Sequence, residues 1–413
     1  MKVSSLKIAL LGMRPPPLKV LFISQIFPTP VNPTKGVFSE QLVHGLLDYC
    51  DVSVVCPQPW FPKLPRWRFL ERWHGYSLIP LEYHVNDIAV LSPKYPFIPK
   101  WGDSYHSSLL FLGLLRHAFQ LRRRFRFDVI NAHWLYPDGV AAAWLARIMR
   151  VPLVLTGLGC DVNMFMFEKG KRESILRALK QAARVTVVSE ELKIHLVEAG
   201  VDDELVTVIR NGVNRKLFFP RDQKESVTVL GLPQRGPCVL FVGRLAEEEE
   251  KGLRHLIDAF QELVRVRKQL TLYVIGDGPM LKTYTELVQN YGLQQHIQFV
   301  GAKAHQDIPI WIGACDVFCL PSKREGCPNV VLEALSSGRP VVASSVGDIP
   351  NLIAHDNGIL VEPGNSYQLC KALDIALTRK WDEEEICGSV STLTWDAAAS
   401  QYYSILLSAC SEP

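Results

Sequence analysis

Short apolar runs alternate with amphipathic stretches along this chain from residue 18 onward. The runs are rich in Val, Ile and Leu, which is typical of strands buried on both faces of a parallel sheet. The pattern of strand, helix, strand starts a second time after Pro237. The sequence therefore predicts an α/β fold with two doubly wound, Rossmann-like domains. The predicted strands are 19–24, 52–57, 128–134, 152–159, 184–190 and 206–212, followed by 238–244, 271–278, 297–303, 316–322, 340–347 and 358–363.

Three segments break this pattern. Periodicity stops at 211–237, where Pro, Gly and charged residues gather as in a linker. The block 57–108 is dense in Pro, Trp, Tyr and Arg, and we expect it to be irregular. No strand is predicted in 381–413, which contains one amphipathic helix. We therefore divide the chain into an N-terminal extension (1–17), a first domain (18–213 plus 381–413) and a second domain (214–380).

Composition excludes several classes of protein. With 48% hydrophobic and 21% charged residues among 413, the chain has enough apolar material for a sizeable core and is not disordered. A net charge of +3 is too small to indicate a nucleic-acid partner. The longest apolar run is far shorter than the ~20 residues of a spanning helix. Ten cysteines without a Cys-x-x-Cys motif favour reduced thiols and a cytoplasmic location.

In doubly wound sheets, ligands bind beyond the carboxyl ends of the strands, and a cleft between two such domains is the expected site. The segment 320–350 is the richest in candidate chemistry, because a strand ends near Ser322 and Pro328 is expected at the first helical position. Free amides at that helix start suit an anion. Glu325 and Glu333 suit the hydroxyls of a sugar, although a solvated pair of acids is the alternative. The residues of this helix start are Gly326, Cys327, Pro328, Asn329 and Val330.

Two cations follow the first strand of the second domain. Gly243 ends that strand, Arg244 comes directly after it, and Lys251 precedes a helix. Together they suit a diphosphate, with Arg244 offering a fork and Lys251 a point charge. The alternative is an ordinary strand-end arginine and a surface lysine. The acidic run 247–250 is expected to form a solvated bulge away from the phosphates.

The first domain offers its own strand-end candidates. His133 ends a predicted strand, where an imidazole can donate to a sugar hydroxyl, although a lone histidine is as often structural. Asp161 follows the next strand behind two glycines. Gly36 opens the first predicted helix, where its amide would approach the same diphosphate from the opposite wall.

The motif "EGCPNVVLEALSSGRPVV", with seven residues between Glu325 and Glu333, resembles the signature of the retaining glycosyltransferases of family 4, which have the GT-B fold. Other segments match further motifs of that family in the same order, and the resemblance spans 18–410. These segments are "PTKGVF", "HWLYPDG", "VIRNGV", "VGR…KG", "VIGDGP" and "FVG".

The resemblance implies a nucleoside diphosphate sugar (a UDP- or GDP-sugar) bound by the second domain and a glycan or lipid-linked acceptor bound by the first. Glu325 would contact the donor sugar, Glu333 the ribose, and His133 the donor sugar from the opposite wall. Arg244 and Lys251 would neutralise the leaving diphosphate. It also implies retention of anomeric configuration, no metal, no other cofactor and a last helix that crosses back to the first domain. The remaining site residues are Gly36, Gly243, Gly276 and Gly301 on the donor side and Asp138, Asp161 and Asn163 on the acceptor side.

Departures from the family pattern affect individual contacts. Arg244 and Lys251 are two residues further apart than is common, Cys327 stands where an aromatic residue is frequent, and Leu158 replaces a usual His or Arg. The alternatives that we keep are a nucleotide-sugar epimerase, a phosphorylase and a non-catalytic nucleotide-sugar-binding subunit. A phosphorylase would need a pyridoxal lysine, for which no candidate pocket is evident.

Two segments of the first domain interleave aromatic residues with arginines: "WFPKLPRWRFLERW" (60–73) and "RHAFQLRRRFRF" (116–127). Segments of this kind rest on anionic lipid headgroups. We therefore expect peripheral contact with the inner face of a membrane, with a solvated basic helix and a Pro-rich acceptor loop as the alternative.

Overall fold

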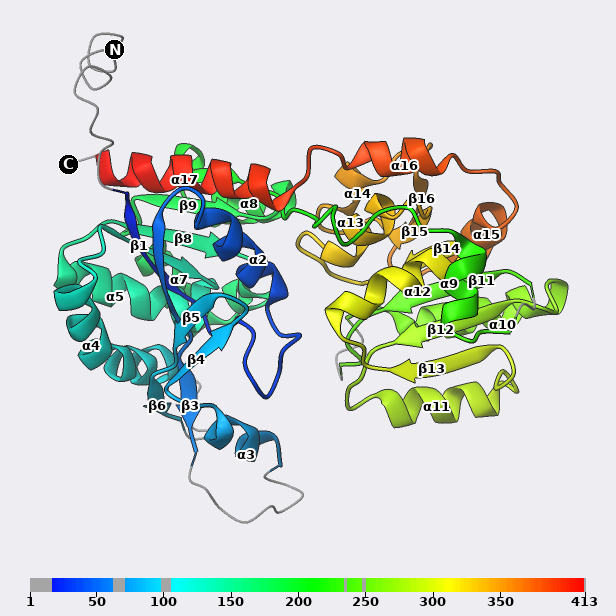
Figure 1. Ribbon diagram of the computed structural model, residues 1–413, viewed down its shortest axis with the longest axis horizontal. Helices are drawn as coiled ribbons and strands as arrows, with labels where there is room; N and C mark the ends of the chain where they lie inside the picture. The colour runs from blue at the N-terminus through cyan, green and yellow to red at the C-terminus, as the bar shows by residue number, and fades with distance from the viewer. Residues whose placement is uncertain (1–16, 62–70, 98–104, 234–235, 247–249, 412–413) are drawn as a thin grey trace, which may run out of the picture.

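The computed structural model describes residues 17–61, 71–97, 105–233, 236–246 and 250–411, arranged as two α/β domains side by side (Figure 1). The predicted N-terminal extension thus lies outside the described residues except for residue 17. Each domain is built on one twisted, largely parallel sheet, and helices cover both faces of each. The predicted fold class is confirmed, because all twelve predicted strands are present in order.

The first domain contains an eight-stranded sheet of order β10-β9-β8-β7-β1-β2-β5-β4. Its centre is formed by β1, β7 and β8, whose side chains are almost all buried, as expected for strands covered on both faces. Only β4 runs antiparallel to its neighbour. The strands are β1 (Lys19–Ile23), β2 (Asp51–Val55), β4 (Glu82–Val85), β5 (Ile88–Leu91), β7 (Val129–His133), β8 (Leu153–Gly157), β9 (Arg184–Val187) and β10 (Val206–Val208).

The second domain contains a six-stranded, fully parallel sheet of order β13-β12-β11-β14-β15-β16. The order reverses between β11 and β14, which is the point where a doubly wound sheet binds its ligand. The strands are β11 (Cys238–Val242), β12 (Thr271–Ile275), β13 (Ile297–Gly301), β14 (Val317–Leu320), β15 (Val341–Ser344) and β16 (Gly358–Val361).

Helices follow nearly every strand, as the hydrophobic periodicity predicts. The first domain has α2 (Val37–Leu46), α3 (Glu71–Leu78), α4 (His106–Arg124), η3 (Leu135–Gly139), α5 (Val140–Met149), α6 (Cys160–Asn163), η4 (Phe165–Phe167), α7 (Lys169–Leu179), α8 (Glu190–Glu198) and η5 (Asp203–Leu205). After it come α9 (Gln223–Val229), α10 (Leu253–Val266), α11 (Leu281–Asn290), η6 (His305–Asp307), α12 (Ile308–Ala314), α13 (Asn329–Ser336), α14 (Ile349–Leu352), α15 (Ser366–Ala376), α16 (Glu383–Ser389) and α17 (Trp395–Ser411).

The block 57–108 is more regular than predicted. The antiparallel pair β4–β5 extends the main sheet beside β2, and β3 (Gln58–Trp60) pairs with β6 (Lys94–Pro96) in a small separate sheet. These strands are short and rich in Pro and charge, so their periodicity is weak. The expected linker 211–237 likewise contains α9, which packs on α12 of the second domain.

The chain crosses between the domains twice, and the two crossings lie side by side. Val213 pairs with Thr394 in an isolated parallel bridge. The last helix α17 then packs on α2 of the first domain (Figure 1), as predicted. The predicted boundary at residue 381 is wrong, however, because α16 packs on α13 in the second domain. The crossing therefore follows α16, whose Ile386 is buried in the core shared with that domain.

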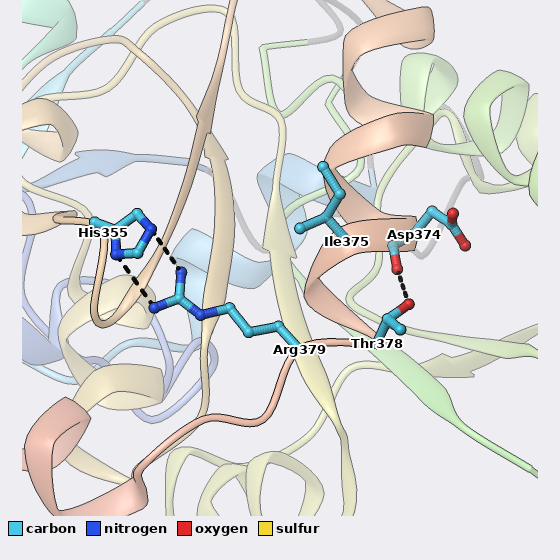
Figure 2. A pocket seen from close by; sticks show the side chains of 5 residues that line it. All are labelled: His355, Asp374, Ile375, Thr378 and Arg379. Atoms are coloured by element: carbon cyan, nitrogen blue, oxygen red, sulfur yellow. Dashed lines mark hydrogen bonds between the residues drawn. The ribbon is translucent and has the colours of Figure 1, made fainter.

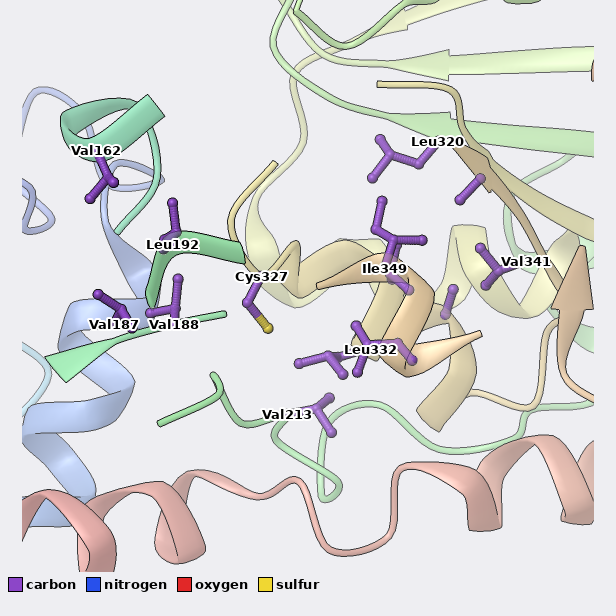
Figure 3. Close-up of a cluster of buried hydrophobic side chains, with 14 of the residues drawn as sticks. Val162, Val187, Val188, Leu192, Val213, Leu320, Cys327, Leu332, Val341 and Ile349 are labelled. Carbon is purple, nitrogen blue, oxygen red and sulfur yellow. The ribbon is translucent and has the colours of Figure 1, made fainter. Parts of the chain in front are cut away.

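One apolar cluster is continuous from the first domain to the second. Val187, Val188 and Leu192 of the first domain belong to the same buried cluster as Cys327 and Leu332 of the second (Figure 3). The burial of apolar surface between the domains favours the arrangement in which the loop before α13 lies against the first domain.

Candidate active site

Loops at the carboxyl ends of β11, β12, β14 and β15 pack directly against one another. A Cβ atom at Gly276 (φ +149°) would lie 1.9 Å from the carbonyl oxygen of Gly243, so the tips of β11 and β12 approach backbone to backbone. The amide of Lys323 donates to the carbonyl of Glu250 (2.7 Å), and that of Asp348 donates to Gly326 (2.8 Å). The four tips therefore form one continuous surface.

A charged cluster occupies that surface. Nζ of Lys251 lies 2.7 and 2.9 Å from the two carboxylate oxygens of Glu325, and Oγ of Ser322 donates to Oε1 of the same carboxylate (2.6 Å). The Lys251 side chain is 28% exposed and that of Glu325 is 7% exposed. The pair is thus held in place while its lysine still reaches solvent.

Arg244 leaves the same edge of the sheet. A Cβ atom at Gly243, the residue before it, would lie 3.4 Å from Cγ of Lys251. The Arg244 side chain is exposed. The structure therefore brings together Gly243, Lys251 and Glu325 around the tips of β11 and β14, and Arg244 directly follows Gly243 in the chain. The roles of these residues toward a ligand stay predictions.

The helix start after Glu325 differs by one residue from the prediction. Pro328 is the N-cap residue, with an extended backbone, and α13 begins at Asn329. Cys327 is buried, and burial raises the pKa of its thiol to about 12, so this side chain is a packing group. Val330 is half-buried and packs against the core.

Side chains of the first domain donate hydrogen bonds to residues around this helix start. The amide of Asn211 donates to the carbonyl of Cys327 (3.2 Å) and to Oδ1 of Asn329 (2.8 Å). Nδ2 of Asn163 donates to the carbonyl of Glu325 (3.4 Å). These bonds fix the main chain on both sides of Gly326 from the opposite domain.

Two further contacts close the same junction. Arg210 donates to both carboxylate oxygens of Asp348 (2.6 and 3.2 Å), whose side chain is fully buried. A Cβ atom at Gly326 would lie 2.4 Å from the carbonyl oxygen of Leu158, so only glycine permits this approach of the two domains. The loop that carries Glu325 is therefore held between the first domain and the tip of β15.

Glu333, in the second turn of α13, forms an ion pair. Its Oε1 lies 2.8 Å from Nε2 of His305, and its side chain is 9% exposed. Burial lowers the pKa of His305, but the hydrogen bond and charge of Glu333, with the charge of Glu40 in α2, raise it above its usual value overall. Glu40 belongs to the first domain, so this pair also faces the interdomain junction.

The structure does not support the predicted role of His133. Its ring is 1% exposed and is packed between Phe22 (ring centroids 4.5 Å apart) and Tyr402 of α17 (5.7 Å). Burial lowers the pKa of His133 to about 3, and neither ring nitrogen has a hydrogen-bond partner in the described part of the chain. This side chain is therefore packed in the core beneath the last helix.

Two predicted acceptor-side carboxylates are also internal. Asp161 is fully buried and accepts hydrogen bonds from the amides of Leu135, Leu158 and Gly159 (2.8–3.2 Å). Asp138 is fully buried and accepts from the main chain and side chain of Gln25 (2.8 and 3.1 Å). Both carboxylates shape loops; Asn163 is the predicted acceptor-side residue that does reach the junction.

The remaining predicted residues are two glycines at the ends of elements and the acidic run 247–250. Gly36 is the N-cap of α2, and a Cβ atom there would lie 2.4 Å from the carbonyl of Ile26. Gly301 (φ +79°) ends β13 with open space around it. Of the acidic run expected to be solvated, 247–249 lie outside the described residues, and Glu250 is half-buried, with Oε1 3.7 Å from Arg324.

Sequence reasoning missed the groups that join the domains or support others. These are Ser322, Arg210, Asn211, Asp348 and His305. Arg210 and Asn211 stand in the quoted motif "VIRNGV", so their signal was present in the sequence, but their partners lie more than 110 residues away.

The second domain also has a surface hollow that none of the predicted site residues line (Figure 2). His355, Asp374, Ile375, Thr378 and Arg379 line it. Its charged groups already have partners, because the Arg379 guanidinium contacts the ring of His355 (3.2 and 3.3 Å) and Asp374 pairs with Arg267 (2.6 Å).

Both domains match known families of glycosyltransferases. Residues 37–217 match the family described as "Glycosyltransferase Family 4", and residues 236–379 match "Glycosyl transferases group 1". TuaC of Bacillus subtilis (strain 168), named for teichuronic acid biosynthesis, is 30% identical over 362 residues, which cover 86% of this chain and 88% of TuaC. The chain therefore belongs to the family 4 glycosyltransferases with the GT-B fold, and it is an enzyme of the transferase class.

Other relatives agree with this assignment. The 2-deoxystreptamine glucosyltransferase of Streptomyces kanamyceticus is 29% identical over 63% of this chain and 70% of its own length. In the solved structures, sucrose-phosphate synthase from Thermosynechococcus elongatus has a TM-score of 0.74 at 21% identity, covering 94% of this chain and 98% of its own. HepE of Anabaena, solved with UDP, has a TM-score of 0.71 at 20% identity, covering 95% and 100%. These two structures share the fold of this chain.

Proposed function

We propose that this glycosyltransferase moves a sugar from a UDP- or GDP-sugar to a glycan or lipid-linked acceptor, with retention of anomeric configuration and without a metal ion. The observation that carries the proposal is the cluster of Lys251, Glu325 and Ser322 at the strand tips, directly before the N-terminus of α13. It supports a diphosphate beside a sugar, because a helix start favours an anion and a fixed carboxylate accepts hydrogen bonds from hydroxyls.

Lysine and arginine side chains supply the positive charge in this proposal. Lys251 and Arg244 lie at the edge where the leaving diphosphate would gain charge, so they would stabilise it in the transition state. A metal ion would perform the same task in other enzymes.

Names of relatives support the substrate classes. One relative is the UDP-Gal:alpha-D-GlcNAc-diphosphoundecaprenol alpha-1,3-galactosyltransferase of Escherichia coli, 28% identical over 62% of this chain and 67% of its own length. TuaC is named for a cell-surface polymer. We therefore propose a donor of the UDP-sugar or GDP-sugar class and an acceptor from a surface-glycan pathway.

A panel of UDP- and GDP-sugars with the full chain tests the proposal, by thermal shift and by release of nucleoside diphosphate. We expect one donor to raise the melting temperature in EDTA as in Mg²⁺, since a ligand stabilises by RT ln(1 + [L]/Kd). NMR of the product should give the donor's anomeric configuration. Glu325→Gln should lower turnover roughly 100- to 1000-fold, and the exposed Glu362→Gln should not. Binding without turnover would favour the non-catalytic subunit, and an altered nucleotide sugar the epimerase.

We further propose that α4 contacts an anionic membrane. Leu112, Arg116, Phe119 and Arg123 recur at helical spacing on its exposed face, and Leu112 and Phe119 are 60% and 47% exposed. The opposite face, with Leu110 and Leu114, is buried. Of the other expected membrane segment (60–73), residues 62–70 lie outside the described residues. No described helix is long and apolar enough to span a bilayer.

Vesicle sedimentation tests this surface. We expect the full chain to sediment with phosphatidylglycerol vesicles and not with phosphatidylcholine vesicles, and Arg116→Glu with Arg123→Glu to abolish sedimentation. Arg265→Glu, on the exposed face of α10, is the matched control. Equal sedimentation with both vesicles would contradict the proposal.

A further inference from the structure

The ion pair between His305 and Glu333 connects η6 with α13. His305 lies in η6, which follows β13, and Glu333 lies in the second turn of α13. Their side chains are 28% and 9% exposed, and Nε2 lies 2.8 Å from Oε1. Among the described residues, no protein donor holds the second carboxylate oxygen of Glu333.

His305 is itself fixed from a second side. The ring of Phe218 lies against it with centroids 5.2 Å apart, and the carbonyl of Phe218 accepts a hydrogen bond from Ser336 of α13 (2.7 Å). Glu40, held by Asn86 (2.8 Å), is the other charged group within electrostatic reach. The histidine therefore has little freedom to leave the carboxylate.

We infer that His305 is a positioning residue for recognition of the donor ribose. It holds one oxygen of Glu333, so that the other oxygen is directed at the vicinal hydroxyls of the nucleotide. This inference rests on the proposed function, because it needs a nucleotide bound at the start of α13.

The physical reason is the cost of ordering a glutamate. A Glu side chain loses rotamer freedom when it is fixed in one conformation, and this loss opposes binding. When His305 has already fixed Glu333, binding of the ribose does not have to meet that cost. A preorganised hydrogen-bonding group also rejects ligands that lack the matching hydroxyl, because its oxygen is then left unpaired.

The test compares ribose and deoxyribose nucleotides on the full chain. Calorimetry gives Kd for UDP and GDP and for their 2′-deoxy and 3′-deoxy counterparts. We expect the wild-type chain to bind at least one ribonucleotide about tenfold or more tightly than a deoxy counterpart. The measured quantity is the Kd of the deoxynucleotide divided by the Kd of the ribonucleotide. In His305→Ala this ratio should fall at least threefold, toward the value for Glu333→Ala. The double variant His305→Ala with Glu333→Ala should show no further fall.

Two variants separate positioning from general damage. His305→Gln places an amide donor within reach of Glu333 and should restore most of the ratio. His355→Ala, an exposed histidine of the same domain, should leave the ratio unchanged. Melting temperatures establish that each variant is folded.

The outcomes distinguish the role of His305 from the proposed function on which it rests. If neither UDP nor GDP binds the wild-type chain, the proposed function is overturned together with the inference. If a nucleotide binds and His305→Ala keeps the wild-type ratio, only the role of His305 is overturned. If Glu333→Ala also keeps it, the ribose contact lies elsewhere and the inference is again overturned.

Discussion

The two sheets of this protein place polar residues at equivalent strand ends, but they use them differently. In the second domain, Lys251 and Glu325 form a charged pair whose lysine remains 28% exposed. In the first domain, His133 and Asp138 are at most 1% exposed. A polar residue at the end of a strand is therefore a candidate for chemistry only when nothing else covers that end.

The strand ends of the first domain are covered by other parts of the chain. The last helix, α17, packs on the first domain and places Tyr402 against His133. Loop amides surround the carboxylate of Asp161. Among the described residues of the second domain, the Lys251 side chain remains partly exposed, and the strand tips beside it approach one another through glycines. The experiments below perturb these two edges, beginning with the largest expected effect.

Removal of the Asp161 carboxylate should damage the first domain most. Asp161→Ala leaves three loop amides, two of them buried, without their acceptor, so we expect a loss of roughly 3 kcal/mol in the free energy of unfolding. Urea titration of the purified chain measures it. Asp87→Ala, in an exposed turn, should change stability by less than about 0.5 kcal/mol. Equal small effects would show that the loop amides find other partners.

Separation of the two domains at the donor loop should remove activity. Gly326→Ala places a Cβ atom 2.4 Å from the carbonyl of Leu158 and so displaces the loop that carries Glu325. We expect turnover to fall about 100-fold, since a displacement of about 1 Å has this effect at a reacting centre. Gly170→Ala, where a Cβ atom meets nothing within 4 Å, is the control. Wild-type turnover in Gly326→Ala would disprove the close contact.

The buried histidine should make the first domain sensitive to acid. The pKa of His133 is lowered by burial to about 3, below its unfolded value of about 6.5. The unfolded chain therefore binds a proton that the folded chain does not, and stability falls as pH drops below about 6.5. At pH 5 the loss is about 2 kcal/mol. His133→Phe should remove this part of the pH dependence, measured as the difference in unfolding free energy between pH 7 and pH 5.

Asp138 does not disturb that comparison. Burial raises the pKa of its carboxyl to about 7, so its own effect on stability has the opposite sign between about pH 4 and pH 7. It is present in both proteins and cancels in the difference. An unchanged acid profile in His133→Phe would indicate that the ring is hydrated in solution.

The smallest effect is expected for Asn211, the residue of the first domain that is hydrogen-bonded to the start of α13. Asn211→Ala removes the hydrogen bonds to Cys327 and Asn329 and loosens the helix start. We expect about tenfold weaker donor binding, equivalent to about 1.4 kcal/mol. Calorimetry with the donor found by the panel measures it, and Asn290→Ala, exposed at the end of α11, is the matched control. Unaltered donor affinity would restrict Asn211 to holding the domains together.

Much of the fold followed from local patterns. The twelve parallel strands and the last helix were predictable because buried strands and amphipathic helices leave a periodic signature within a few residues. The loop from Ser322 to the start of α13 was predictable for the same reason, since Pro328 and the preceding strand mark it. Strands β3–β6 and the placement of α16 were not predictable. The strands are short with weak patterns, and the partners of β3 and β6, the main-sheet neighbour of β5 and the helix that α16 packs on are distant in sequence.

By itself the sequence determined the two-sheet architecture, the family and the strand tips that carry Lys251 and Glu325. Only the tertiary structure decided that His133 is buried, that Asn211 reaches across to Cys327, and that His305 holds Glu333. The physical reason is that exposure and side-chain partners are set by segments folded together from distant parts of the chain. A strand end has the same local sequence whether or not another helix later covers it.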